Sequence, residues 1–440
     1  MDKSTLKAKI CETIDQYKDE IISIGQDIYD HPELGYKEFY ATNLISNKFK
    51  ELGLSVKDHI AVTGCRGSIN QDKNGPKIAV LGEMDAIMCH EHKDADKETG
   101  AIHACGHHIQ SAAMMGVAIG LIRSGAIDSL DGKIDFFAVP AEEFVELEYR
   151  SQLKDAGKIK YFGGKQELIS NGEFDDVSMA MMIHSLDLEK ENKKALIGPV
   201  GNGFVGKKVQ FIGKESHAGG APEKGVNALN AAMLAINNIH AQRETFTEAE
   251  RVRVHPIITK GGDIVNVVPA DVRMESYVRA RTINGMLDAN TKVNRALRAG
   301  AMAVGANIKI NEIPGYLPLL QNDPLDTLFK NNIQSFISEE EIFEGGDFTG
   351  SFDFGDVSHI IPTLHPMIGG ISGDLHTRDF KVSDDELAYI ISAKAMAMTI
   401  VDLLFDHAKE ANNILSNFKP VLTKEEYLKL LEGIDRTIEE

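Results

Sequence analysis

The pattern of apolar positions divides the first part of the chain into helices and short buried strands. Apolar residues recur three or four positions apart across residues 5–30, which predicts an amphipathic helix that ends near His31. A second helix is predicted over 40–52. Apolar runs follow at 77–82, 133–140 and 177–184, with helical stretches between them, of which 110–124 is the clearest. This alternation predicts an α/β domain with a largely parallel, buried sheet.

The pattern changes after about residue 200 and returns near Pro318. Between these points the predicted order is strand, helix, strand, strand, helix, strand, as in ferredoxin-like units. We therefore predict two domains, with an inserted α+β domain over 199–316 and a main α/β domain formed by 1–198 and 317–440. A last helix of the main domain is predicted over 384–406. The inserted elements are expected at 207–212, 226–243, 251–260, 265–279, 283–304 and 307–313.

Composition and charge narrow the class of protein. The 440 residues are 43% hydrophobic and 26% charged, which is typical of a folded globular chain, and the length suits two domains. The formal charge of -19 repels phosphate backbones and anionic lipids, so we expect neither nucleic acid nor a membrane as a partner. The first residues lack the apolar core of a signal peptide, and the four cysteines make no disulfide framework. We therefore expect a cytoplasmic protein with reduced thiols.

Three predicted strands end in residues that can do chemistry. The segments at these ends are Gly82-Glu83-Met84-Asp85, Pro140-Ala141-Glu142-Glu143 and Ile183-His184. In open α/β sheets, ligands bind at the carboxyl ends of the strands, so we expect these segments to meet at one site. The segment Gly163-Gly164-Lys165 lacks the upstream spacing of a phosphate loop and is interpreted as a turn.

Residues 103–108, with the sequence His-Ala-Cys-Gly-His-His, form the densest group of metal-ligating residues. Thiolate and imidazole groups are preferred ligands of zinc and similar ions. Gly106 permits a tight turn, so that Cys105 and His107 can face one point. The alternative is that Cys105 is a small buried hydrophobe and that the histidines line a surface loop. Three histidines and a cysteine within six residues favour the metal site.

Glu142 and Glu143 follow a mostly apolar predicted strand. Two adjacent carboxylates at the end of a buried strand are costly unless a cation lies beside them. Because adjacent side chains usually diverge, one can bind a metal while the other acts as general base toward the water that the metal activates. By itself such a pair is more typical of a solvated strand end, and its significance comes from its companions. Asp85 is a candidate to orient an imidazole ligand by a hydrogen bond.

Motifs spread over nearly the whole chain occur in an order that is far more specific than any one of them. They are His31-Pro-Glu-Leu-Gly-Tyr-Lys-Glu-Phe39, Gly82-Glu-Met-Asp85-Ala, His103-Ala-Cys-Gly-His107, Pro140-Ala-Glu-Glu143, Ser216-His217-Ala, Gly261-Gly-Asp-Ile-Val-Asn266-Val-Val-Pro269 and His376-Thr-Arg-Asp-Phe380. Together they resemble the M20 metallopeptidases, in particular the amidohydrolase branch that includes aminobenzoyl-glutamate and N-acyl-amino-acid hydrolases. We interpret the first of these motifs as structural.

The resemblance implies a fold and a set of site residues. It implies a zinc-peptidase-like α/β catalytic domain with an inserted ferredoxin-like lid and dimerisation domain, and a homodimer formed through the lid. It implies two divalent ions per subunit, Mn²⁺ or Zn²⁺ with Ni²⁺ or Co²⁺ as alternatives, and a bridging role for Cys105. Glu142 would be the acid/base, and His217 and Asn266 would bind the substrate or its oxyanion. The implied metal ligands are Cys105, His107, Glu143, His184 and His376.

The chain departs from the pattern of this branch at positions that bear on specificity. Where these amidohydrolases usually have Cys-Gly-His-Asp-x-His, this chain has His108 and Gln110 in place of the last Asp and His. Glu223 replaces a histidine of the lid, and residues 351–358 resemble the aminobenzoyl-glutamate hydrolase subgroup. The implied metal ligands are unaffected by these changes.

We therefore expect metal-dependent hydrolysis of an amide bond in an N-acyl amino acid, an aminobenzoyl-glutamate-like conjugate or a small peptide. Arg378, two residues after His376, is a candidate for binding a substrate carboxylate, with a surface salt bridge as the alternative. Two other functions stay open. In one, Cys105 is a nucleophile with His107 or His108 as its base. In the other, the chain is a non-catalytic metal- or peptide-binding protein, although pure binding has no need of a base such as Glu142.

Overall fold

The computed structural model describes residues 2–440, which form two compact units. Unit 1 comprises the chain up to Val200 together with Leu320–Asp347 and Val357–Val421. Unit 2 comprises Gly201–Leu319, Phe348–Asp356 and Leu422–Glu440. The insert expected at 199–316 corresponds to the main segment of unit 2. Two stretches that were expected in the main domain, 348–356 and 422–440, also belong to unit 2.

The central sheet of unit 1 is parallel at its core. Its strands stand in the order β1-β2-β6-β3-β7-β17, in which β6, β3, β7 and β17 run parallel and β1 and β2 form an antiparallel edge. Every residue of β3 is buried, as expected for a strand inside a parallel sheet. The prediction of a parallel, buried sheet is therefore confirmed. The strands are β1 (Ser55–Ile60), β2 (Gly64–Ile69), β3 (Lys77–Glu83), β6 (Lys133–Val139), β7 (Met179–Met181) and β17 (Thr363–Leu364).

His184 belongs to a second, smaller sheet of unit 1 and not to the central sheet. The single strand predicted over 177–184 is in fact two elements, β7 and β8 (His184–Ser185). β8 pairs with β18 in a sheet of order β15-β9-β18-β8. The chain thus passes from the central sheet to the smaller sheet between Met181 and His184. The other strands of this sheet are β9 (Ala195–Ile197), β15 (Ile342–Glu344) and β18 (Met367–Ile368).

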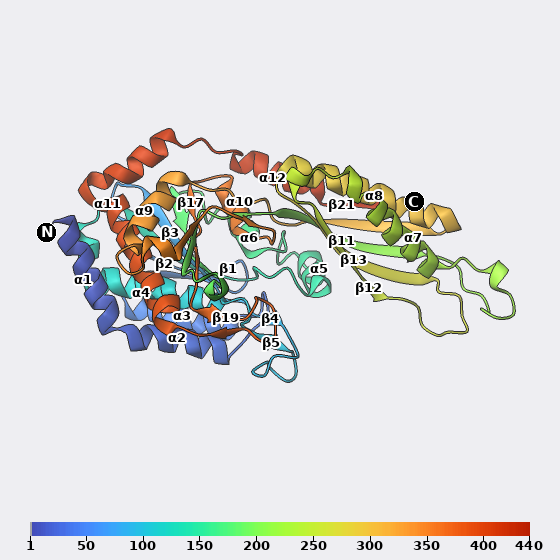
Figure 1. Ribbon diagram of the computed structural model, residues 1–440, viewed down its shortest axis with the longest axis horizontal. Helices are drawn as coiled ribbons and strands as arrows, with labels where there is room; N and C mark the ends of the chain where they lie inside the picture. The colour runs from blue at the N-terminus through green and yellow to red at the C-terminus, as the bar shows by residue number, and fades with distance from the viewer. Residues whose placement is uncertain (1) are drawn as a thin grey trace. The chain divides into compact units, whose positions relative to one another are not determined.

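Helix α4 (His107–Arg123) forms the centre of the helical layer of unit 1 (Figure 1). It packs against β3 and is covered by α1 (Lys3–Gln16), α2 (Lys18–Asp30) and α11 (Ser392–Asn417). Its residues from 107 to 121 are all buried, so it lacks the polar stripe of a surface helix. The single helix predicted over 5–30 is two helices, because the backbone leaves helical geometry at Tyr17.

The remaining elements of unit 1 are short. The helices are α3 (Phe39–Glu51), α5 (Leu147–Asp155), α6 (Gly164–Ser170) and α9 (Asp323–Ile333). The paired short strands are β4 (Ile87–Met88) with β5 (Ala101–Ile102), and β19 (Ile371–Ser372) with β20 (Lys381–Val382). At the unit boundaries lie β10 (Val200–Gly201), β16 (Asp347–Phe348) and α10 (Phe354–Ser358).

The C-terminal helix of unit 1 extends further than the predicted 384–406. It begins as a π-helical segment, Glu386–Ile391, and continues as α11, which is interrupted by positive φ at Asp406, His407 and Ala408. The stretch Glu386–Asn417 is long and apolar enough to span a membrane, but 94% of its most apolar part is buried inside the structure. Such burial is the behaviour of a core helix.

Unit 2 has the predicted order strand, helix, strand, strand, helix, strand. Its antiparallel sheet has the order β12-β13-β11-β14-β21, and α7 and α8 pack on it and on each other. The burial of β13 alternates along the strand, as expected for a sheet with one face on a core. The elements are β11 (Gly203–Ile212), α7 (Ala228–Ala241), β12 (Arg253–Lys260), β13 (Asp271–Ala280), α8 (Ile283–Val304) and β14 (Asn307–Pro314).

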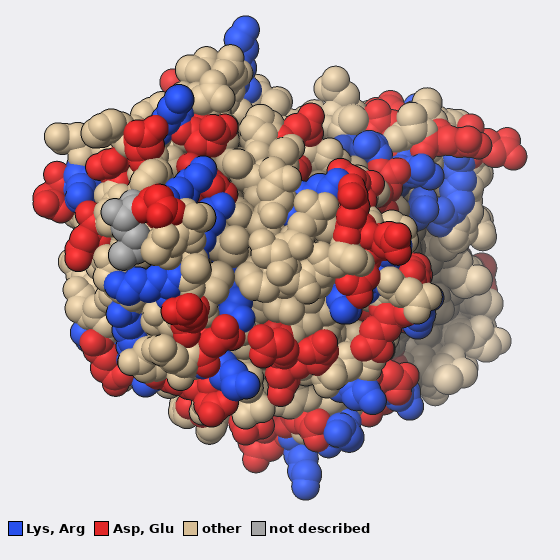
Figure 2. All heavy atoms as spheres, turned by 60° about the vertical axis from the view of Figure 1, so that its left-hand side comes forward, with Lys and Arg blue, Asp and Glu red and all other residues tan. Residues whose placement is uncertain are grey.

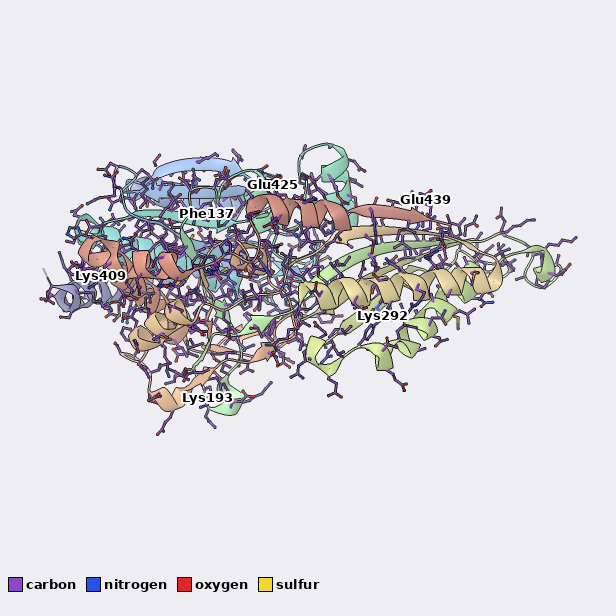
Figure 3. The ribbon with its side chains drawn as sticks, turned by 90° about the horizontal axis from the view of Figure 1, so that it is seen from above. Phe137, Lys193, Lys292, Lys409, Glu425 and Glu439 are labelled. Carbon is purple, nitrogen blue, oxygen red and sulfur yellow. The ribbon has the colours of Figure 1, made fainter. Side chains whose placement is uncertain are left out.

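The C-terminal segment adds a strand that the sequence pattern does not predict. Helix α12 (Lys424–Ile434) leads into β21 (Arg436–Glu439), which pairs with β14 at the edge of the sheet (Figure 3). The hydroxyl of Tyr427 in α12 donates to Asp356 at 2.8 Å, which ties residues 348–356 to the same unit. These contacts explain why both stretches belong to unit 2.

A buried ion pair lies between the sheet and the helices of unit 2. The Lys207 ammonium and the Glu312 carboxylate, both 0% exposed, are 2.7 Å apart, and Asn290 and Asn294 donate to the same carboxylate. Arg436 of β21 also pairs with Glu312. A buried pair is tolerated only when its remaining polar atoms are satisfied, as they are here.

Charged side chains of both signs are interspersed on the face drawn in Figure 2. Acidic and basic residues alternate there around a neutral area, although the chain as a whole carries a formal charge of -19. The excess of acidic residues therefore does not gather into a single patch on this face.

Candidate metal centre and active site

The turn before α4 places Cys105 and His107 on one site. Gly106 is the N-cap of α4 and has φ 83°, in the left-handed region. A Cβ atom at this position would lie 2.8 Å from Ser185 Oγ, so the close approach of β8 also requires glycine. Cys105 precedes this turn and His107 is the first residue of α4, and both are buried.

Two groups of ligand atoms share the thiol of Cys105. Cys105 Sγ lies 3.6 Å from His184 Nε2, and the ligand atoms of Cys105, His107 and His184 all lie within 4.8 Å of one another. Cys105 Sγ also lies 3.3 Å from His376 Nε2, which is 3.0 Å from Glu143 Oε1. These distances bring the five implied metal ligands together around one sulfur atom.

The histidines around Cys105 favour its thiolate form. Burial and the charge of Glu143 raise the pKa of the thiol, but His376, His107 and His184 outweigh them and lower it to about 6. The thiolate is the form that binds metal ions.

His376 is the most exposed of the five implied metal ligands, with 46% of its side chain accessible. Its backbone N–H donates to the Ala104 carbonyl at 2.9 Å.

Hydrogen bonds to the outer nitrogens orient the two buried imidazoles. His107 Nδ1 lies 2.8 Å from the backbone carbonyl of Asp85 and 3.1 Å from its Oδ1. His184 Nδ1 lies 2.8 Å from the carbonyl of Ser185. Because these oxygens only accept, each Nδ1 carries the hydrogen, and each Nε2 is left to face the site.

Asp85 also holds the backbone of a second ligand. Its Oδ2 accepts the N–H of Glu143 at 2.8 Å, while its Oδ1 contacts His107. One carboxylate at the end of β3 therefore positions residues from α4 and from the turn after β6.

The turn after β6 separates the carboxylates of Glu142 and Glu143. Ala141 has φ 55°, which redirects the chain directly before the pair. Glu142 Oε2 lies 3.8 Å from His107 Nε2, whereas Glu143 Oε1 lies beside His376. The two side chains therefore approach different parts of the centre, as their adjacency in sequence suggests.

Glu38 and Arg150 hold this turn from two sides, and neither is singled out by the sequence pattern. Glu38 Oε1 accepts the backbone N–H of Ala141 at 2.7 Å. From the other side, the buried Arg150 guanidinium donates to the carbonyls of Ala141 and Glu143. Burial, together with the charge of Asp85, raises the pKa of Glu38 to about 8. Glu38 belongs to the motif 31–39, which the sequence analysis interprets as structural without assigning Glu38 a role.

Glu83 and Lys165 are also part of the site, and the sequence reading gave neither a role. Glu83 Oε2 lies 3.1 Å from His107 Nε2, and its Oε1 lies 2.5 Å from Lys165 Nζ. Lys165 was interpreted as a turn residue, but it lies in α6 with a fully buried side chain. The available signal was Glu83 itself, a charged residue at the end of an apolar strand.

The structure places His217 and Asn266 together in unit 2. The backbone N–H of Ala218 donates to the carbonyl of Asn266 at 3.0 Å, and the N–H of Gly220 donates to His217 Nδ1 at 2.9 Å. Both side chains are exposed. Glu223, in the same unit, is exposed as well.

The remaining candidates lie in unit 1. Arg378 is exposed. His108 is buried beside His103 and Tyr29, with ring centroids 5.6 Å and 5.0 Å away. Gln110 Oε1 accepts the backbone N–H of Glu83 at 3.3 Å. Gln110 thus contacts the strand end that carries Glu83, whereas His108 packs against residues outside the implied ligand set.

The donor set fits divalent metal ions. Thiolate, imidazole and carboxylate groups are the ligands of zinc, manganese and similar ions. His107 Nε2 and Glu83 Oε2 are buried, and apart from their own contact at 3.1 Å neither has a hydrogen-bond partner among the described residues. Buried polar atoms with so few partners that converge on one region indicate a cation between them.

Comparisons with known proteins agree with this geometry. The M20 peptidase dimerisation domain matches residues 202–303. The Xaa-Arg dipeptidase of Mus musculus is 29% identical over 96% of this chain and 94% of its own, and the N-acetyl-L-cysteine deacetylase of Bacillus subtilis is 26% identical over 89% and 90%. A dinuclear metal-binding peptidase of the M20 family from Bacillus subtilis superposes with a TM-score of 0.64, at 20% identity, over 89% of this chain and 99% of its own.

Fold, ligand set and relatives together support a metallohydrolase that is similar to the M20 peptidases. The comparisons confirm the resemblance to the M20 metallopeptidases and amidohydrolases, the two-domain fold with its inserted dimerisation domain, and the enzymatic class. The grouped ligand atoms of the site support divalent metal ions as cofactors.

Proposed function

We propose that this protein hydrolyses an amide bond in an N-acyl amino acid, an aminobenzoyl-glutamate-like conjugate or a small peptide, at a centre of two divalent ions. The observation that carries the proposal is the pair of ligand groups that share Cys105, with the Glu142 carboxylate beside them. Manganese or zinc is the proposed metal, with nickel or cobalt as alternatives, because thiolate, imidazole and carboxylate ligands suit these ions.

Each of the two ligand groups would hold one of the two ions. Cys105, His107 and His184 would hold one ion, and Cys105, Glu143 and His376 the other. Bound ions would supply Lewis acidity, which lowers the pKa of a water molecule and polarises the amide carbonyl. Asp85 fixes the positions of His107 and Glu143 relative to each other, because its Oδ1 contacts His107 Nδ1 and its Oδ2 accepts the N–H of Glu143.

Glu142 is the proposed general base and acid. Its carboxylate lies 3.8 Å from a ligand nitrogen of His107 and does not belong to either ligand group around Cys105. It is 5% exposed, so a proton that it takes from the attacking water is kept for the leaving amine rather than lost to solvent.

Substrate binding is assigned to three further residues. His217 and Asn266 of unit 2 would donate hydrogen bonds to the substrate or its oxyanion. The exposed Arg378 would hold a substrate carboxylate. We also propose a homodimer through unit 2, supported by the match to a dimerisation domain and by the free edge of β12, where Ile257 is 60% exposed.

The substrate class is proposed from the relatives, which are named as an Xaa-Arg dipeptidase, an N-acetyl-L-cysteine deacetylase and an IAA-amino acid hydrolase. A cytoplasmic location is proposed with it, because all four cysteines are free thiols.

Assays on a panel of substrates test the proposal. Metal-stripped protein is given Mn²⁺ or Zn²⁺ and offered Xaa-Arg dipeptides, N-acetyl amino acids and aminobenzoyl-glutamate. Turnover of at least one substrate that requires the added metal is expected. Activity that resists chelators and is lost on thiol alkylation would instead support Cys105 as a nucleophile. Metal binding without turnover of any substrate would support a non-catalytic binding protein.

A further inference from the structure

We infer that Glu83 is an additional metal ligand, which completes the shell around the ion held by Cys105, His107 and His184, and that Lys165 positions it. The inference rests on the proposed metal centre. It assigns a role to the buried pair at the end of β3, which the five-ligand scheme leaves unused.

The position of the Glu83 carboxylate matches that of a ligand. Its Oε2 lies 3.1 Å from His107 Nε2, and the ligand atoms of Glu83, His107 and Glu142 lie within 4.8 Å of one another. Two ligand atoms that bind one ion at about 2.1 Å stand about 3 to 3.5 Å apart. His107 Nε2 belongs both to this group and to the group around Cys105, so an ion bound to His107 has Glu83 as its neighbour.

The two atoms that face each other can both act as metal ligands. Because His107 Nδ1 contacts Asp85, Nε2 is the ring nitrogen that faces the carboxylate oxygen. His107 is 0% exposed and Glu83 1% exposed, and apart from their contact with each other neither Nε2 nor Oε2 has a hydrogen-bond partner among the described residues. Without a metal ion a proton on Nε2 can pair the two groups, and a metal ion in place of that proton makes both of them ligands.

Lys165 holds the other carboxylate oxygen of Glu83, Oε1, in an ion pair. Its ammonium lies 2.5 Å from Glu83 Oε1, and its side chain is fully buried. With Oε1 held in this way, Glu83 can offer Oε2 alone. The ammonium also balances charge, because Glu83, Asp85, Cys105, Glu142 and Glu143 as anions are matched by two divalent ions and one lysine.

A fourth ligand makes the two ions unequal. His107 is shared by the group with Cys105 and His184 and by the group with Glu83, so the ion bound to His107 would gain Glu83 as a ligand, whereas the other would have Cys105, Glu143 and His376. The first is therefore the tighter site. The second keeps an open position of the kind that catalytic metal sites offer to water and substrate.

A competing role for Glu83 is to neutralise Lys165 without touching the metal. Replacing one member of a buried pair leaves the other charge uncompensated, so the single variant Glu83→Gln cannot separate the two roles. The double variant Glu83→Gln/Lys165→Met can, because it removes both charges together. If Glu83 only neutralises Lys165, the double variant regains the metal affinity of the wild type.

The experiment measures metal binding rather than activity. Apo forms of the wild type, Glu83→Gln and the double variant are titrated with Zn²⁺ by calorimetry, and folding is checked by circular dichroism. The absorption spectrum of the Co²⁺-loaded forms reports the coordination number. The matched control is Glu312→Gln in unit 2, which breaks a buried Glu–Lys pair of the same kind at 2.7 Å.

The expected result is two unequal sites in the wild type and in Glu312→Gln. In the double variant the tighter site should weaken by more than about 100-fold, beyond the loss typical of residues that only orient a ligand. Its Co²⁺ spectrum should change as well. Wild-type affinity and an unchanged Co²⁺ spectrum in the double variant would overturn the inference and leave the proposed function standing. A wild type that binds no divalent ion would overturn both.

Discussion

The carboxylate of Glu38 accepts the backbone N–H of Ala141 at 2.7 Å. The two residues are 103 positions apart, and Ala141 directly precedes Glu142 and Glu143. A motif near the N-terminus thus holds the turn that presents the proposed base and one of the proposed ligands. The Thr63 hydroxyl donates to the second oxygen of Glu38 at 2.5 Å and completes the anchor.

The stability of the metal-free protein should fall as pH rises because of Glu38. Burial and the charge of Asp85 raise its pKa from 4.5 to about 8. Between these values the unfolded chain has released a proton that the folded chain keeps. Stability contributed by the neutral carboxyl is therefore present below pH 4.5 and lost toward pH 8, by at most ~1.4 kcal/mol per pH unit.

Denaturant unfolding of chelator-treated protein at several pH values measures this slope. Glu38→Gln stays neutral and should lose it, whereas Glu167→Gln, which alters another buried carboxylate of unit 1, should retain it. Equal slopes in wild type and Glu38→Gln would show that another group is responsible.

Glu142→Gln should lower kcat by about 10²- to 10⁴-fold and retain both metal ions, because the amide cannot accept a proton. Glu143→Gln should instead lose metal. Glu146→Gln is the control, since Glu146 follows in the same segment but pairs with Lys37 at 2.7 Å. Steady-state kinetics with metal analysis of each variant checks this. Near-wild-type turnover in metal-loaded Glu142→Gln would refute Glu142 as the base.

Asp85→Asn should weaken metal binding by about 10- to 100-fold. Its Oδ1 and Oδ2 contact His107 Nδ1 and the N–H of Glu143, and an amide can accept from only one of these donors. Asp135→Asn is the control, because Asp135 is equally buried but pairs with Lys77 in the sheet. Equilibrium dialysis against Zn²⁺ compares the two. Equal affinities in both variants would contradict the positioning role of Asp85.

Gly106→Ala should destabilise the protein more than Gly53→Ala does. The two glycines have φ 83° and 80°, so both substitutions carry a conformational penalty of about 1 to 2 kcal/mol. A Cβ atom at Gly106 would lie 2.8 Å from Ser185 Oγ, whereas one at Gly53 would meet nothing within 4 Å. Only Gly106→Ala should also weaken metal binding. Denaturant unfolding and metal titration measure both effects. Equal losses of stability in the two variants would mean that β8 moves to make room for the added methyl group.

The local order of elements could be read from the sequence. Unit 2 has the predicted order because each element there carries its own periodicity, as in α8, whose bounds Ile283–Val304 coincide with the predicted range. Cys105 and His107 could be singled out because residues 103–107 form a compact group, and strand ends meet at one edge of a parallel sheet, whereas the full set of ligands was implied by the resemblance to the M20 metallopeptidases. These are short-range patterns and a general rule of topology.

Contacts between distant segments were decided only by the tertiary structure. Lys165 and Glu83 are 82 positions apart, and nothing in the segment 163–165 distinguishes a buried partner of a carboxylate from a surface turn. The same holds for β21, a short and mostly exposed segment that becomes a strand because β14 offers it an open edge. Local periodicity records which face of an element is buried, but the partner that buries it depends on packing across the whole chain.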